Sequence, residues 1–301
     1  MLYKTKRPPV EEAGSCERGG SGMKDSMNAE GSLKEYEQHL RENERSEHTI
    51  EKYLRDVRSF LGWKGEQELT RQLMIRWKQS LVDAGYQVRS INSMLASVNS
   101  YLRFIGQESC RTGNLKLQRQ LYSKPQQELS RNDYMKLLAA AAGNARLQML
   151  LQTICSTGIR VSELEYFTLE AVKTGEVTVS CKKKSRTVLL PGKLKKALVR
   201  YARENRITSG IIFRTRNGTP LNRSNIWVQM KALCQAAGVE PSKVFPHNLR
   251  KLFARSFYRI SKDIAKLADV LGHSSIDTTR IYIMTTGSEH LAQLERLALL
   301  L

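Results

Sequence analysis

Apolar residues recur every three or four positions through much of the first third of the chain, and this spacing is typical of α-helices. The pattern starts at residue 33 and is clearest over residues 70–83 and 88–105. We therefore expect an all-α unit of four helices over residues 33–108. Residues 1–32 contain paired prolines and glycines and almost no apolar periodicity, so we expect a flexible tail there.

The helical pattern is interrupted once and then returns in a different form. Residues 109–127 lose the periodicity, which predicts a linker, and residues 128–301 regain it. Two alternating, β-branched stretches, Glu176–Cys181 and Arg186–Leu190, flank a short basic turn and predict a β-hairpin. Ile211–Phe213 is a candidate third strand. The expected fold class is mainly α with a small antiparallel β-sheet: a four-helix unit followed by an α+β unit.

Charge is the compositional feature that narrows the function most. The chain has 49 Lys and Arg against 29 Asp and Glu, a net charge of +20, and a sequence pI near 9.9. Residues 122–301 hold 29 basic and 13 acidic side chains, so +16 of the excess lies in the C-terminal part. A polyanion is the expected partner of such a surface. A generically basic cytosolic protein is the alternative.

Several other classes of protein are disfavoured by the sequence. No apolar run approaches the ~18–20 residues that span a bilayer, and the first 30 residues carry no apolar core like that of a signal peptide. We therefore expect a cytoplasmic protein with no membrane partner. The five cysteines are scattered and include no Cys-x-x-Cys pair, which disfavours a disulfide scaffold or a zinc site. No metal is expected.

One face of the predicted helix over residues 88–105 carries small polar and basic side chains, opposite the apolar face. Four of them are candidates to lie along a DNA backbone: Arg89, Asn92, Ser93 and Arg103. A solvated face with no partner explains this helix, taken alone, at least as well.

Candidate catalytic residues gather in the C-terminal part. Arg160 follows a Thr-Gly-Ile turn, His247 and Arg250 share one face at the start of a predicted helix, and Tyr282 comes nine residues (282 − 273) after His273. Arginine binds phosphate oxygens bidentately, histidine moves protons near neutral pH, and tyrosine can form a covalent aryl phosphate. Each residue alone has an ordinary structural explanation, but together they predict a site for a phosphodiester.

A lysine of the predicted hairpin completes this set. Lys182, Lys183 and Lys184 follow the first strand, and a lysine at such a tip could protonate a departing 5′ oxygen. Lys183 and Lys184 are also candidates to contact DNA. No carboxylate cluster for two metal ions is apparent, which argues against metal-assisted phosphoryl transfer.

Three segments of the chain closely resemble the tyrosine recombinases, the phage-integrase and Xer group: Thr157–Leu164, His247–Arg250 and Leu271–Tyr282. The order Arg, Lys, His-x-x-Arg, His, Tyr matches, and so does the nine-residue step before the tyrosine. The resemblance covers roughly residues 33–301 and is weaker in the N-terminal helices, where only the layout matches. It implies a site-specific enzyme that cuts and rejoins duplex DNA through a 3′-phosphotyrosyl intermediate, without a cofactor.

The resemblance also implies a role for each matching residue. Tyr282 matches the nucleophile, and Arg160 and Arg250 match the pair that clamps the scissile phosphate. Glu163 matches a supporting acidic position that orients the site. His247 and His273 match the positions that hydrogen-bond the phosphate and assist proton transfer.

The hairpin departs from the family pattern. Its turn looks about two residues shorter than the usual Gly-Lys-Gly type of turn. When the strand Val177–Cys181 is laid on the family's strand, Lys182 is favoured as the general acid, and Lys183 and Lys184 stay open.

The implied architecture is a core-binding domain, residues 33–108, and a catalytic domain, residues 128–301, that clamp duplex DNA. The last helix, about residues 288–301, is expected to dock into a neighbouring subunit, with packing on its own domain as the alternative. A homo-tetramer would then act on two DNA sites.

The expected role is to integrate and excise a mobile element, with an accessory excision factor as a candidate partner. Xer-type dimer resolution and DNA inversion use the same chemistry and are alternatives. A type IB topoisomerase is disfavoured by the resemblance. A non-catalytic DNA-binding protein on the same fold is the alternative from a different class, and it would not need Tyr282 or the paired arginines.

Overall fold

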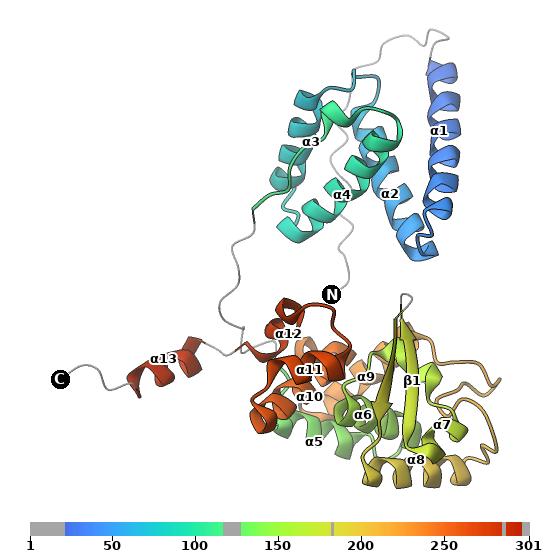
Figure 1. Ribbon diagram of the computed structural model, residues 1–301, viewed down its shortest axis with the longest axis vertical. Helices are drawn as coiled ribbons and strands as arrows, with labels where there is room; N and C mark the ends of the chain where they lie inside the picture. The colour runs from blue at the N-terminus through green and yellow to red at the C-terminus, as the bar shows by residue number, and fades with distance from the viewer. Residues whose placement is uncertain (1–21, 117–127, 182–183, 285–286, 297–301) are drawn as a thin grey trace. The chain divides into compact units, whose positions relative to one another are not determined.

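The computed structural model describes four stretches of the chain (Figure 1), residues 22–116, 128–181, 184–284 and 287–296. The chain divides into two compact units, residues 1–119 and 120–301, and each is described by itself. The division lies inside the predicted linker, residues 109–127, of which residues 117–127 lie outside the described residues.

The first unit is helical throughout its described part. Its α-helices are α1 (Gly22–Glu42), α2 (Glu47–Lys64), α3 (Arg71–Asp83) and α4 (Val88–Phe104), followed by the 3-10 helix η1 (Glu108–Cys110). Thr70 begins α3 as an N-cap, because its side chain accepts a hydrogen bond from the Leu73 amide. The apolar faces meet in one core, in which Tyr36, Phe60 and Trp77 are almost fully buried.

Helix α1 begins at Gly22, although the sequence predicted a flexible tail up to residue 32. The prediction was wrong for residues 22–32 because it relied on apolar periodicity, which those residues lack. Leu33, Tyr36 and Leu40 anchor the helix in the core, and each further residue then adds a backbone hydrogen bond without a new nucleation cost. Residues 1–21 lie outside the described residues.

Residues 109–116, predicted as the start of the linker, instead pack onto α4. The side-chain amide of Asn92 donates to the Leu115 carbonyl at 2.9 Å, and its oxygen accepts from the Leu115 amide at 2.8 Å. Asn99 holds the backbone of Thr112 in the same way, at 2.8 and 3.3 Å. These residues belong to the first unit, and the prediction was wrong because bonds from side chains to backbone leave no periodic pattern.

The second unit is mainly helical, with a small antiparallel sheet. Its helices are α5 (Arg131–Ala140), α6 (Ala145–Thr157), η3 (Val161–Tyr166), α7 (Leu169–Thr174), α8 (Gly192–Glu204), α9 (Arg223–Ala237), η4 (Pro241–Lys243), α10 (Pro246–Ser261), α11 (Ile264–Leu271), α12 (Ile276–Ile283) and α13 (Gly287–Glu295).

Strands β1 (Glu176–Cys181) and β2 (Lys184–Leu189) form the hairpin that the alternating pattern predicted. The candidate third strand, Ile211–Phe213, is wrong: Ile211 makes only an isolated bridge with Thr168. The rest of that run is buried, with Phe213 only 1% exposed. The apolar residues therefore fill the core of the unit and do not extend the sheet.

The ends of two helices set the backbone of the candidate site. Helix α6 is capped at its C-terminus by Gly158, whose φ of +66° lies in the left-handed region, and an added Cβ there would lie 2.3 Å from the ring of Phe253. Glycine is therefore required for the chain to turn toward Arg160. Helix α11 is capped by Gly272 in the same conformation, φ +64°, and His273 follows directly.

The predicted last helix, about residues 288–301, is observed as α13, and residues 297–301 lie outside the described residues. Leu291 and Leu294 on α13 are 57% and 50% exposed. In the described part of the chain, no helix combines the length and apolar character needed to cross a membrane.

Candidate active site

Arg160 lies in the turn between α6 and η3, where Glu163 holds it. The guanidinium Nη1 donates to Glu163 Oε1 at 2.8 Å, and the backbone amide of Arg160 donates to Oε2 at 2.8 Å. Glu163 is 1% exposed, whereas the side chain of Arg160 keeps 36% of its surface exposed. The buried carboxylate therefore fixes the guanidinium and leaves part of it open to a ligand.

Arg250, on α10, is buried at 2% exposure. Its guanidinium donates to the carbonyl of Gly158 and, at 2.6 Å, to that of Leu271, so it ties the ends of α6 and α11 together. Its Nε atom is buried and has no hydrogen-bond partner among the described residues. Burial, and then the charge of Arg160, lowers the pKa of Arg250 to about 10, so it remains cationic at neutral pH.

His273 lies beside Arg250, in the turn after α11. Its Nε2 is 3.0 Å from Arg250 Nη2, and its Nδ1 is 2.9 Å from the hydroxyl of Thr279. Because a guanidinium only donates, Nε2 must accept, and the ring proton is assigned to Nδ1. This pair of contacts therefore selects the neutral imidazole and fixes its orientation.

Tyr282, on α12, faces both candidate histidines. The residue is 8% exposed, and the ring centroids of His247 and His273 each lie 5.0 Å from that of Tyr282. The guanidinium carbon of Arg250 lies 6.0 Å from the same ring. Four sequence-predicted residues, carried by α10, the turn after α11, and α12, are thus brought together.

Both histidines have a pKa lowered to about 4. In each histidine the pKa is lowered mainly by burial, because the surrounding protein displaces water from the ring. The next cause is the charge of a positive neighbour, which is Lys251 for His247 and Arg250 for His273. The two rings are therefore uncharged at pH 7. His247 is the more exposed of the two.

The hairpin lysines are placed only through the ends of the strands. Lys182 and Lys183 lie outside the described residues, and Lys184 begins β2 opposite Cys181, the last residue of β1. The choice of Lys182 as general acid stays a prediction.

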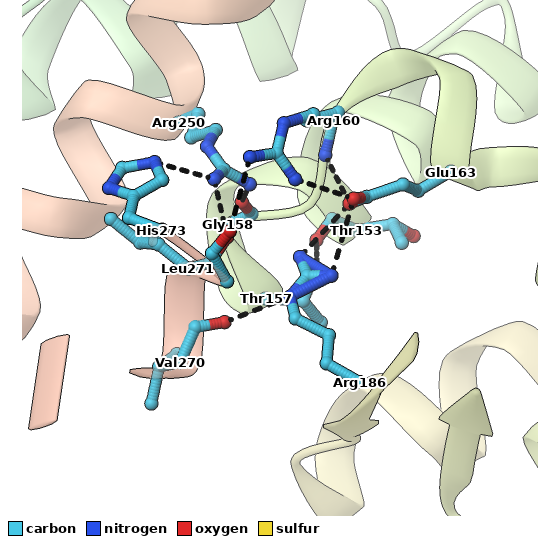
Figure 2. A network of polar contacts seen from close by, with 11 residues as sticks. Thr153, Thr157, Gly158, Arg160, Glu163, Arg186, Arg250, Val270, Leu271 and His273 are labelled. Atoms are coloured by element: carbon cyan, nitrogen blue, oxygen red, sulfur yellow. Dashed lines mark hydrogen bonds and ion pairs between the residues drawn. The ribbon is translucent and has the colours of Figure 1, made fainter. Parts of the chain in front are cut away.

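Arg186, on β2, also belongs to this cluster, although the sequence reasoning did not select it. Its Nη1 and Nη2 donate to the two carboxylate oxygens of Glu163 at 3.2 and 3.0 Å, and its Nε donates to the Val270 carbonyl at 3.4 Å (Figure 2). The strand alternation contained the signal. Arg186 shares a strand face with the buried Val188 and Leu190, which predicts an inward-facing charge that needs a buried partner.

The four residues predicted to contact DNA from α4 differ in their surroundings. Arg89, Ser93 and Arg103 are exposed, and Arg103 Nε lies 3.7 Å from the carboxylate of Glu108. Asn92 uses both its amide nitrogen and its oxygen on the backbone of residues 109–116, as described above. The structure therefore gives Asn92 a role in packing the first unit.

The cluster combines groups suited to one kind of ligand. The guanidinium of Arg250, two neutral imidazoles and a phenol lie together, and the guanidinium of Arg160 lies 3.5 Å from the Gly272 carbonyl in the turn before His273. Such groups can bind and attack a phosphodiester. In the stretches that the structure describes, no three His, Cys, Asp or Glu side chains lie close enough together to hold a metal ion.

The sequence matches known proteins along most of its length. Residues 127–288 match the Phage integrase family, and residues 33–109 match the Phage integrase, N-terminal SAM-like domain. Tyrosine recombinase XerA of Thermococcus kodakarensis is 31% identical over 277 residues, which cover 89% of this chain and 95% of that protein. Tyrosine recombinase XerD of Rickettsia bellii is 27% identical over 274 residues, with 81% and 90% covered.

Solved structures share the fold. A lambda integrase dimer bound to a core site superposes with a TM-score of 0.68 at 18% identity, covering 86% of this chain and 96% of that chain. The integrase of transposon Tn1549, in complex with transposon right end DNA, has a TM-score of 0.68 at 16% identity, with 89% and 99% covered. The expected fold class, mainly α with a small antiparallel sheet, is confirmed.

Proposed function

Because the chain belongs to the Phage integrase family of tyrosine recombinases, we propose that it cuts and rejoins duplex DNA at specific sites through a 3′-phosphotyrosyl intermediate formed on Tyr282. The observation that carries the proposal is the convergence of Tyr282, His247, His273 and Arg250, with ring centroids 5.0 Å apart and the guanidinium 6.0 Å from the tyrosine ring. A DNA-binding protein without chemistry would not need this arrangement.

In the proposed reaction, Arg160 and Arg250 bind the non-bridging oxygens of the scissile phosphate and offset the charge that develops there. The buried Nε of Arg250, which has no partner among the described residues, suits such an anion. Tyr282 Oη attacks phosphorus, the bond from phosphorus to the 5′ oxygen breaks, and a neutral histidine accepts the phenol proton. Attack by a 5′ hydroxyl on the phosphotyrosine reverses these steps and rejoins the strand.

The leaving 5′ oxygen needs a proton, and we assign it to Lys182 of the hairpin. Replacing Lys182 by alanine should slow cleavage ~10²–10⁴-fold, the usual contribution of a general acid. A substrate with sulfur in place of the 5′ bridging oxygen should restore the rate, because a thiolate leaves without a proton. Lys183→Ala and Lys184→Ala are the matched controls; if one of them shows this rescue instead, that lysine is the acid.

The test of the nucleophile is a covalent-adduct assay on nicked suicide substrates. Wild-type protein should form a DNA adduct that survives denaturing electrophoresis. Tyr282→Phe should bind the same DNA with unchanged affinity and form none. Tyr258→Phe is the matched control, because Tyr258 packs against the same apolar cluster as Tyr282 and should keep full adduct formation. An adduct that persists in Tyr282→Phe would refute the assignment.

For the biological role, we propose integration and excision of a mobile element. The segment that begins at Tyr282 with Tyr-Ile-Met-Thr-Thr-Gly resembles the integrases of such elements. Xer-type resolution is the second candidate, because the relatives reported above carry Xer names. Suicide substrates built from the boundaries of the gene's own genomic neighbourhood decide between them. An adduct on boundary DNA supports the element, whereas an adduct only on other chromosomal sites supports resolution.

We further propose that four protomers act on two DNA sites, each passing its last helix to a neighbour. The exposed Leu291 and Leu294 on α13 support this, since an apolar helix face gains stability when a partner covers it. A lambda integrase tetramer bound to a Holliday junction shares the fold, with a TM-score of 0.68. Leu291→Asp should leave cleavage of an isolated site intact and abolish strand exchange; sedimentation on DNA measures the lost assembly.

A further inference from the structure

Arg186 links three pieces of the candidate site that are distant in sequence. It extends from β2 two residues after Lys184, opposite Val179 of β1, and its guanidinium contacts Glu163 in η3 and the Val270 carbonyl near the end of α11. Glu163 in turn holds Arg160. Figure 2 shows the carboxylate of Glu163 between the guanidiniums of Arg160 and Arg186.

The turn that carries His273 is packed directly on Arg186. An added Cβ at Gly272 would lie 2.5 Å from Cδ and 2.8 Å from Nε of Arg186. The carbonyl of Gly272 also lies 3.5 Å from Nη2 of Arg160. The same turn thus contacts both arginines, so a displacement of Arg186 would also shift the turn and its contact with Arg160.

The balance of charge makes Glu163 depend on Arg186. Glu163 is 1% exposed, and each carboxylate oxygen receives hydrogen bonds from both arginines. A buried carboxylate that loses one of two cations is destabilised and moves toward the other. Without Arg186, Glu163 would therefore be drawn into a different contact with Arg160 and would turn its guanidinium away from the present orientation.

We propose that Arg186 is a positioning residue for strand cleavage: through Glu163 it sets the orientation of the Arg160 guanidinium toward the scissile phosphate. The inference rests on the proposed function, in which Arg160 binds that phosphate. The side chain of Arg186 is only 14% exposed and acts from behind Glu163, so it need not touch the DNA.

The experiment measures single-turnover cleavage of a nicked suicide substrate at saturating protein, together with DNA affinity. Arg186→Met should lower the cleavage rate about 100-fold, the loss expected when a catalytic group is misplaced by about 1 Å, and change DNA affinity less than about threefold. Arg186→Lys keeps the charge without the two parallel bonds and should lose an intermediate amount. Arg200→Met removes an exposed Arg–Glu contact on α8 and should cleave as the wild type.

A double variant separates positioning from general damage to the fold. If Arg186 acts through Arg160, adding Arg186→Met to Arg160→Lys should cost almost nothing further, whereas independent effects would multiply. The deficit of Arg186→Met should also persist on a substrate with a 5′ bridging sulfur. Rescue by sulfur would place the effect on the hairpin lysine and overturn the proposal.

Three other results would overturn it: multiplied losses, an unchanged rate in Arg186→Met, or an equal fall in Arg200→Met. If Arg186→Met shows no cooperative melting, the same comparison is made with Arg186→Lys, added to the wild type and to Arg160→Lys, and its result decides the question. A wild type that forms no Tyr282-dependent adduct on any tested duplex would instead refute the proposed function itself.

Discussion

The two units use their polar side chains in different ways. In the first unit they stabilise the fold: Asn92 and Asn99 hold the backbone of residues 109–116, and Ser97 donates to Asp56 at 2.9 Å, beside Lys52 at 2.8 Å from the same carboxylate. In the second unit, Arg250, two histidines and a tyrosine from separate elements converge on one point. A polar helix face alone therefore does not identify a ligand surface, whereas spaced residues that the topology brings together do.

Among the changes that test this contrast between the units, the largest expected effect comes from Arg250, which serves both the fold and the proposed chemistry. Arg250→Met removes a cation at the phosphate site and should lower the cleavage rate about 10³-fold. It also leaves the buried carbonyls of Gly158 and Leu271 without their donor, which should lower the free energy of unfolding by about 2–4 kcal/mol. Single-turnover cleavage and urea denaturation measure the two losses.

Arg259→Met is the matched control for this experiment, because Arg259 lies exposed on the same helix. It should change neither quantity. If Arg250→Met lost activity at full stability, its bonds to the two carbonyls would not contribute to the fold, and Arg250 would serve the proposed chemistry alone.

A smaller effect follows from the histidines, whose pKa of about 4 lies below the ordinary value near 6.5. Between these values the unfolded chain binds protons that the folded chain does not, so stability falls as the pH drops from about 6.5 toward 4. His273, which is half-buried, should contribute about 1 kcal/mol to this loss between pH 7.5 and 5.5; the exposed His247 adds in the same direction.

Thermal unfolding at pH 7.5 and 5.5 measures this loss. A variant with His247→Asn and His273→Asn lacks both rings and should show a flatter profile. Bound site DNA should also flatten the profile of the wild type, because a phosphate beside the rings raises their pKa. An identical pH dependence in the variant would show that the pKa values of these two rings do not differ between the folded and unfolded chains.

The sequence was sufficient where local patterns decide the outcome. Apolar periodicity predicted α2, α3 and α4, and alternation predicted the hairpin, because each depends on neighbouring residues alone. The motif residues were chosen by spacing and family likeness, and the structure brings Tyr282, His247, His273 and Arg250 together.

The sequence was insufficient where a residue's role depends on a distant partner. The role of Arg186 depends on its contact with Glu163, which lies 23 residues away in sequence. The sequence predicted a DNA contact for Asn92, whose side chain instead bonds the backbone of Leu115. The early start of α1 at Gly22 has a related cause: the helix is anchored by residues that follow it, so the first turns leave no pattern of their own.

The smallest expected effects test the first unit. Asn92→Ala should lower the free energy of unfolding of that unit by about 1 kcal/mol, since the backbone of Leu115 loses both bonds, and leave the salt dependence of DNA binding unchanged.

Arg89→Ala removes an exposed cation. If Arg89 contacts a phosphate, this variant should reduce the log–log slope of affinity against salt by ~0.9 with no loss of stability. Binding titrations over a range of salt concentrations measure the slopes. If Asn92→Ala instead weakened DNA affinity at an unchanged slope and with no loss of stability, the uncharged amide of Asn92 would contact DNA after all, and the two units would use their polar residues alike.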